Sequence, residues 1–127
     1  MPLLGELDIR RATAVDLNAT GDLASFTGLP TNILIDRLIL WGWSTTPAAL
    51  LAATLRDAAS AGGNSLVGVI AALNTPITAT TLAAVMFPSV TALGASRVVT
   101  SGALYLNVSA SNGSALTANV SVLYWPL

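Results

Sequence analysis

Residues 32–43 read NILIDRLILWGW, and this stretch gives the strongest indication of how the chain folds. β-branched and aromatic residues, which are enriched in strands, run through it. Because side chains alternate along a strand, one face would carry Ile33, Ile35, Arg37 and Ile39, and the other Leu34, Asp36, Leu38 and Leu40. Both faces are apolar apart from Asp36 and Arg37, so we expect this strand to be covered on both sides.

The next segment, residues 46–61 (TPAALLAATLRDAASA), fits either a helix or a strand. Propensity alone favours a helix, with Thr45 or Thr46 as the cap, Pro47 in the first turn, and then alanine and leucine. Periodicity does not decide, because alanine suits either face of either element. Gly62, Gly63 and Asn64 follow as a tight turn before a further apolar run.

The clearest strand pattern lies at the end of the chain, over residues 98–127. Apolar residues alternate with Tyr, Asn, Ser and Thr in two runs, which are separated by Asn112-Gly113. If the runs form a hairpin, a two-residue loop would set apolar side chains opposite polar ones. A three-residue loop, residues 111–113, instead pairs Val108 with Leu116 and Leu106 with Ala118. We therefore predict this hairpin register and a positive φ at Gly113.

The first 31 residues are expected to form an extended N-terminal arm, followed by a domain over residues 32–127. Residues 7–14 could make a short strand within the arm. Residues 16–30 are rich in Asn, Thr, Gly and Asp, which favour turns. At 127 residues, the chain is long enough for one hydrophobic core.

Charge is distributed very unevenly along the sequence. Charged residues make up 9% of the chain, against about a quarter in ordinary soluble domains. Arg97 is the single charged residue after Asp57. Mean hydropathy is +0.73. A half of the chain with so few charges either enters lipid or packs against other protein.

A membrane-spanning helix is not expected, although residues 58–96 carry no charge. Glycine, asparagine, threonine and proline interrupt the stretch, among them Pro76 and Pro88, and much of its hydropathy comes from alanine. No window gives the roughly twenty predominantly apolar residues that a spanning helix needs. Binding of nucleic acid is not expected either, because only Arg10 and Arg11 come near a basic stripe. The uncharged half is therefore expected to be a protein interface.

The residues present give little basis for catalysis, a metal site or a cofactor. The chain has no His, no Cys and no Lys, which supply most catalytic bases and nucleophiles. Oxygen side chains at Asp16, Asn18 and Thr20, with Gly21 next, match the start of a calcium loop. The twelfth position, however, is Thr27 and not Glu, so a polar turn is the favoured interpretation. We expect a protein that is not an enzyme and that has no cofactor or metal.

Candidate interface residues are therefore charged and aromatic side chains in or beside the expected strands. Aromatics in strands serve more often as core or interface anchors than as platforms for sugars, and adjacent acid–base pairs favour surface or interface contacts. The candidates are Arg10, Arg11, Asp36, Arg37, Arg56, Asp57, Trp41 and Trp43.

Two stretches resemble small structural proteins of tailed bacteriophages. Residues 54–67 (TLRDAASAGGNSLV) resemble a strand that ends in Ala/Ser-rich sequence, turns through a glycine pair and resumes with Leu-Val. Residues 103–109 (ALYLNVS) and 118–124 (ANVSVLY) resemble the final hairpin of the same proteins. The departures are Arg56-Asp57, where an aromatic is common, and the Trp125-Pro126 ending.

The resemblance implies a fold and a function. Proteins of this kind are jelly-roll modules that decorate or cement virions, usually as trimers at threefold positions of the capsid. It implies an all-β, antiparallel β-sandwich (jelly-roll-like), and therefore a strand near Leu55. It further implies a homotrimer that binds the major capsid protein on the outer surface of the capsid. The alternative is a tail-fibre or baseplate module that binds carbohydrate.

Overall fold

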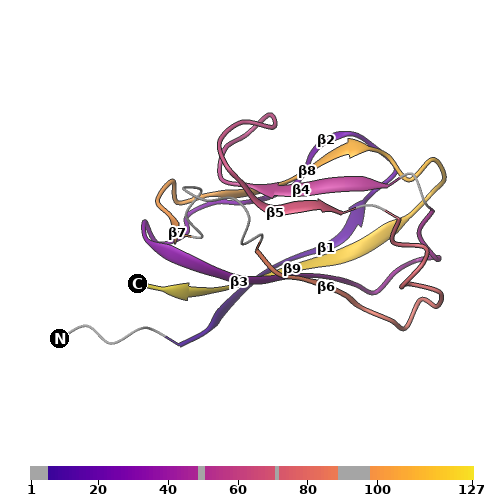
Figure 1. The fold of residues 1–127 in the computed structure, drawn as a ribbon, viewed down its shortest axis with the longest axis horizontal. Helices are drawn as coiled ribbons and strands as arrows, with labels where there is room; N and C mark the ends of the chain where they lie inside the picture. The colour runs from indigo at the N-terminus through magenta and orange to yellow at the C-terminus, as the bar shows by residue number, and fades with distance from the viewer. Residues whose placement is uncertain (1–5, 49–50, 71, 89–97) are drawn as a thin grey trace.

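The chain folds into two antiparallel sheets that pack face to face (Figure 1). The structure is a computed structural model that describes residues 6–48, 51–70, 72–88 and 98–127. The five-stranded sheet has the order β1 (Asp8–Asp16), β9 (Thr117–Pro126), β3 (Ile33–Trp41) and β6 (Ala84–Met86), with β7 (Val98–Val99) also paired to β3. The four-stranded sheet has the order β2 (Gly21–Phe26), β8 (Leu104–Ala110), β4 (Ala52–Arg56) and β5 (Ser65–Ile70). The described residues contain no helix.

The strand order confirms the predicted antiparallel β-sandwich. Strands that follow one another in the sequence mostly lie in different sheets: β1 pairs with β9, and β2 pairs with β8. Among the described strands, only β4 and β5 are both consecutive and paired. If β6 and β7 are taken as one interrupted strand, the two four-strand orders are those of a jelly roll.

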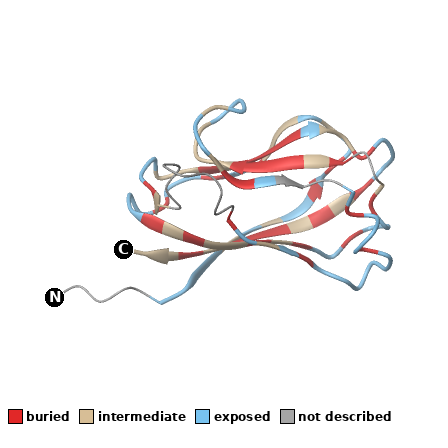
Figure 2. Cartoon of the chain, viewed as in Figure 1, coloured by how far each residue is buried: buried red, intermediate tan, exposed pale blue. Residues whose placement is uncertain are grey.

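The core lies between the two sheets, and in β8 and β9 its apolar residues alternate along the strand (Figure 2). From β8, the inward residues are Leu104, Leu106 and Val108; from β9, they are Ala118, Val120, Val122 and Tyr124. All of these are at most 1% exposed. Polar or half-exposed residues alternate with most of them, as a two-layer sandwich requires.

β3 lies between β9 and the strands β6 and β7, and its faces differ from the simple alternation. Ile33, Ile35, Leu38 and Leu40 are the buried residues. The pairing with β9 shifts between Ile35 and Arg37, which leaves Asp36 as the extra residue of a β-bulge. The predicted face assignment was therefore wrong beyond Ile35, because the bulge reverses which residues point inward.

Residues 46–61 contain the strand β4 (Ala52–Arg56) across their middle and no helix in the part that the structure describes. β4 supplies the residues Ala53 and Leu55 to the core and pairs with both β5 and β8. The implied strand near Leu55 is thus confirmed. Tertiary pairing overrides the helical propensity of the alanines here.

The predicted hairpin at the end of the chain is wrong, because β8 and β9 belong to different sheets. The residues that were predicted to pair in one sheet are all buried in the core, although β8 and β9 lie in different sheets. Gly113 does have a positive φ, of 85°. It sits in a connection that crosses from one sheet to the other, where Asn112 is 1% exposed.

The N-terminal residues also differ from the expected arm. From Asp8 onward, β1 pairs along β9, and β2 pairs along β8, so both strands are part of the sandwich. Val15, Leu17, Ala24 and Phe26 enter the core. The turn between the strands is polar, with the Asp16 carboxylate accepting the Asn18 N–H at 2.8 Å. The polar composition predicted this turn correctly, and the short strand expected over residues 7–14 falls within β1, but β2 was not predicted.

Gly42, which follows β3, should tolerate a side chain much less well than Gly28. Both glycines have a φ near 66° (66° and 67°), so alanine is strained at either site. An added Cβ at Gly42 would lie 2.5 Å from Nδ2 of Asn119, whereas at Gly28 it would meet nothing within 4 Å. Asn119 also accepts the backbone N–H of Ala14 at 3.0 Å.

We therefore expect Gly42→Ala to lower the free energy of unfolding by about 1–2 kcal/mol more than Gly28→Ala, because Asn119 must move and lose its hydrogen bond. Urea denaturation of both variants measures the difference. In the Asn119→Ala background the difference should disappear. Equal costs in the native background would contradict the close contact.

Candidate interaction surface

The outward face of the five-stranded sheet is mostly apolar. Pairing across β1, β9, β3 and β6 arranges its side chains in rows. Ile9 lies opposite Leu123, Leu34 lies between Trp125 and Val98, and Ile39 lies between Ser121 and Val85. We define the outer apolar face by Ile9, Leu34, Ile39, Trp41, Val85, Phe87, Val98, Leu123 and Trp125.

Several of these side chains are more exposed than is usual for large apolar residues. Phe87 is 62% exposed, Val85 45% and Trp41 38%. Antiparallel sheets commonly pack one face on the core and leave a polar face to water. A contiguous exposed apolar patch on a sheet marks a surface that associates with something else.

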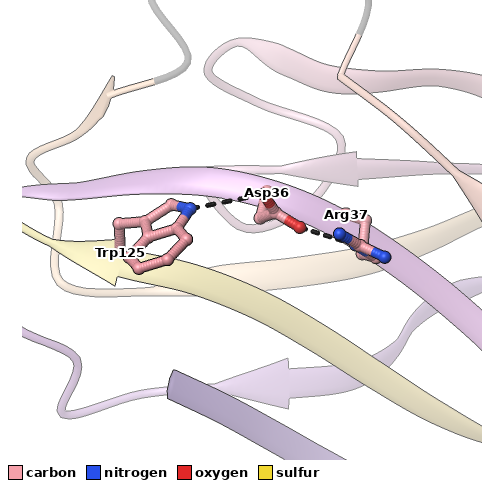
Figure 3. A network of polar contacts seen from close by, with 3 residues as sticks. All are labelled: Asp36, Arg37 and Trp125. Atoms are coloured by element: carbon pink, nitrogen blue, oxygen red, sulfur yellow. Dashed lines mark hydrogen bonds and ion pairs between the residues drawn. The ribbon is translucent and has the colours of Figure 1, made fainter. Parts of the chain in front are cut away.

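A small polar cluster interrupts the outer apolar face at the β3 bulge (Figure 3). Arg37 Nε donates to Asp36 Oδ2 at 2.5 Å, and Trp125 Nε1 donates to Asp36 Oδ1 at 3.3 Å. The Arg37 guanidinium also lies 5.7 Å from the centre of the Phe87 ring. Asp36 holds the Trp125 ring by a hydrogen bond, and Arg37 contacts the Phe87 ring through a cation–π interaction. The opposite charges of Asp36 and Arg37 leave little net charge in the cluster.

The outward face of the four-stranded sheet has the opposite character. Asp22 accepts hydrogen bonds from the Asn107 amide at 2.9 Å and from the Ser60 backbone N–H at 2.8 Å. Arg56 donates to the Thr54 hydroxyl at 3.2 Å. Exposed Ser25 and Ser109 and the half-exposed Tyr105 also lie on this face. The sandwich therefore has one polar outer face and one apolar outer face.

The structure divides the predicted interface residues between several places. Arg11, Asp36, Arg37 and Trp41 lie on the outward side of the five-stranded sheet, Arg11 on β1 and the other three on β3. Arg56 and Asp57 lie at the end of β4 in the other sheet.

The two remaining candidates occupy different environments. Arg10, on the edge strand β1, reaches the Gly28 carbonyl at 3.5 Å. Trp43 is 4% exposed, and its indole N–H donates to the Leu82 carbonyl at 2.9 Å. Trp43 therefore lies in the core and not on the surface. Arg97, the lone charge of the second half, lies outside the described residues.

Sequence reasoning missed most of the apolar residues of this surface, such as Val85 and Phe87. The signal that could have found them is the alternation in residues 84–87, Ala-Val-Met-Phe. Ala84 and Met86 point inward, and Val85 and Phe87 point outward. A run in which both sets are apolar indicates a strand with both faces covered.

Other kinds of site find no counterpart in the part of the chain that the structure describes. No three acidic, His or Cys side chains come together there as a possible metal site. No helix long and apolar enough to cross a bilayer occurs within the same residues. Comparison with models of known protein families and with curated proteins finds no match for this chain.

At the edge of the five-stranded sheet, the Asp8 carboxylate on β1 accepts a hydrogen bond at 2.8 Å from the hydroxyl of the core residue Tyr124. That bond lowers the pKa of Asp8, and the Ile9 N–H adds to the effect. Burial raises the pKa of Tyr124, and the bond to Asp8 raises it further. The contact joins the first and last strands of the chain.

The stability of the fold should therefore fall at both ends of the pH scale. Because the pKa of Asp8 is lower in the folded chain, its contribution is present above the unfolded value of about 3.9 and is lost as the pH falls through the folded value. Because the pKa of Tyr124 is raised, stability is lost as the pH rises above about 10. We expect Tyr124→Phe to be less stable at neutral pH and to show a weaker dependence in both ranges. Urea midpoints measured against pH test this, and two parallel curves would contradict it.

Proposed function

We propose that the chain is a structural protein that associates with other protein subunits through the outer apolar face, and that it has no catalytic role. The observation that carries the proposal is the contrast between the two outward faces, of which one is polar and the other exposes Phe87, Val85 and Trp41. The overall charge content of 9% agrees with a chain that is not surrounded by water on all sides.

The outer apolar face is large enough to form most of one side of a protein–protein interface. The sheet is roughly 20 Å across and roughly 30 Å along its nine-residue strands, from the usual strand spacing and rise per residue. Stable protein interfaces remove about 800 Å² from each partner, so this face with its rim can provide most of one side. Burial of apolar area contributes about 25 cal/mol per Å² to such an association.

On the strength of the resemblance, we further propose that the protein is a decoration or cement protein of a bacteriophage capsid. In this proposal it forms a homotrimer, binds the major capsid protein and lies on the outer surface of the virion. Arg11 and the Asp36–Arg37 pair would give orientation and register to the contact, because charged groups at an interface contribute more to specificity than to affinity.

Quantification in purified virus particles tests this proposal. A copy number comparable to that of the major capsid protein supports a cement protein, and the mass of the protein in solution tests the trimer. Absence from every particle contradicts the proposal, as does a chain that remains monomeric and does not bind capsids.

A carbohydrate-binding module of a phage tail is the second candidate, and the exposed ring of Trp41 favours it. If the protein is such a module, Trp41→Ala should abolish binding to host-surface glycan and leave the mass in solution unchanged. If it is a cement protein, the same substitution should weaken association with other protein subunits and have no effect on glycan binding. A few copies per particle would also point to the tail.

A further inference from the structure

Asn112 and Gly113 form the single Asn-Gly pair of the sequence, and this pair of residues has a chemistry of its own. In an unfolded chain, the backbone nitrogen of the residue that follows an asparagine can attack Cγ of the asparagine side chain. Glycine permits this attack best, because it has no side chain in the way and adopts a wide range of backbone angles. The chain therefore contains one asparagine that is especially prone to deamidation.

The fold engages the Asn112 side chain in a way that opposes this reaction. The residue is 1% exposed. Its side-chain oxygen accepts the Ala48 N–H at 2.7 Å, and its nitrogen donates to the carbonyl and the hydroxyl of Ser114 at 3.1 Å each. Its backbone N–H donates to the Leu17 carbonyl at 3.0 Å. Ring closure onto the Gly113 nitrogen turns both the side chain and the backbone of Asn112, so these bonds must break and the connection must open first.

We propose that Asn112 is a deamidation site that the folded chain protects and the unfolded chain exposes. In the open chain, the Gly113 nitrogen bonds to Cγ of Asn112 and gives up its proton. The bond between Cγ and Nδ2 breaks, and ammonia leaves with that proton. Water then opens the cyclic imide at either carbonyl and gives aspartate or isoaspartate. The proposal is independent of the function proposed above, because it concerns the connection between β8 and β9 and not the outer apolar face.

Both products are poorly suited to the buried site. An aspartate side chain could still accept the Ala48 N–H, but it would have no proton to donate to the Ser114 carbonyl. The groups that bond the side chain, the Ala48 N–H and the carbonyl and hydroxyl of Ser114, are all uncharged, so none of them balances a buried carboxylate. Isoaspartate adds a methylene group to the main chain and lengthens a connection whose two ends lie in different sheets. We therefore expect modified chains to fail to refold, which makes unfolding irreversible with time.

The rates of deamidation in the folded and the unfolded wild type test the protection. The protein is kept at mildly alkaline pH, with and without urea above the unfolding midpoint, and peptide mapping by mass spectrometry locates the modified residue. Trypsin releases residues 98–127 as one peptide, because Arg97 is the last basic residue. Asn112 should react at least about a hundredfold more slowly in the folded chain, because the reaction must wait for opening. The exposed Asn74, which precedes threonine, should show a much smaller difference. Equal rates at Asn112 in the two states would overturn the proposal.

Refolding of the same samples tests the consequence. After increasing times in urea the chain is diluted into buffer, and folded protein is separated from unfolded and aggregated chains. Deamidated Asn112 should be at least about tenfold enriched among the chains that do not refold. The matched variant Asn74→Ala should lose its refolding yield as fast as the wild type does, whereas Asn112→Ala should keep its own starting yield. Equal proportions of modified chains in the two wild-type fractions would overturn the proposal, and this comparison needs no variant.

Asn112→Asp isolates the effect of the new charge. Its loss of stability relative to the wild type should be largest above neutral pH and should shrink as the pH falls towards about 3.9, because a protonated carboxyl group can again donate to Ser114. The comparison with the wild type at each pH removes the contribution of Asp8. Asn74→Asp is the control and should show no such dependence. A loss of stability at Asn112→Asp that is the same at every pH would overturn the proposed reason why modified chains do not refold.

Discussion

The double variant Ile39→Lys/Val85→Glu should lose association with protein partners while keeping its fold. These residues lie directly opposite each other on β3 and β6, so lysine and glutamate form an oppositely charged cross-strand pair that supports the sheet. The same two charges stand within the outer apolar face, where a partner would have to desolvate them. We expect binding to weaken at least about a hundredfold, measured by sedimentation or by binding to capsids.

A matched control exists on the polar face of the sandwich. Ser25 and Tyr105 are also opposite each other, on β2 and β8, so Ser25→Lys/Tyr105→Glu introduces the same pair into the other sheet. This variant should associate as the wild type does. Equal behaviour of the two double variants, with both folded, would show that the outer apolar face does not mediate the contact.

Asn112→Ala should give the largest loss of stability among single polar substitutions. The Asn112 side chain accepts the Ala48 N–H at 2.7 Å and donates to the Ser114 carbonyl and hydroxyl at 3.1 Å each. Its backbone N–H donates to the Leu17 carbonyl at 3.0 Å. Alanine would keep the backbone bond to Leu17 but would leave the Ala48 N–H and the two Ser114 oxygens without their side-chain partner and would empty the buried site of the amide, at a cost of about 2–4 kcal/mol.

Urea denaturation measures this loss, and Asn74→Ala is the comparison. Asn74 is exposed, and its side chain makes no hydrogen bond within the described residues, so its replacement should change stability by less than about 0.5 kcal/mol. Similar small effects at both positions would contradict the role of Asn112 in joining three segments.

Local sequence patterns correctly predicted many of the residues that enter the core. They were less successful in predicting which strands pair with each other. Alternation identified Leu104, Leu106 and Val108, as well as Val120 and Val122, as inward residues. Alternation sets the direction of side chains but does not specify the neighbouring strand, so two runs around Asn-Gly fitted a hairpin equally well. The connection crosses between sheets because Asn112 and Leu17 hold it there.

The candidate surface was predicted in part for a similar reason. Trp41 and the Asp36–Arg37 pair were recognised by residue type, and the structure places them on one face. A single bulged residue exchanges the two faces of β3, and no local pattern marks a bulge between two apolar runs. Trp43 was misassigned because an indole serves equally well in a core and at an interface when its N–H finds a partner.

The pairing of β1 with β9 has a consequence for the synthesis of the chain on the ribosome. The first strand to emerge must wait for the last, since Asp8 and Tyr124 stand opposite each other near the two ends of the described chain. At roughly 5–20 residues per second, most of the domain is made before the five-stranded sheet can close. Until then, the apolar strands between them lack their partners. Folding is therefore expected to be mainly post-translational, and newly made chains should depend on chaperones more than a protein of neighbouring hairpins would.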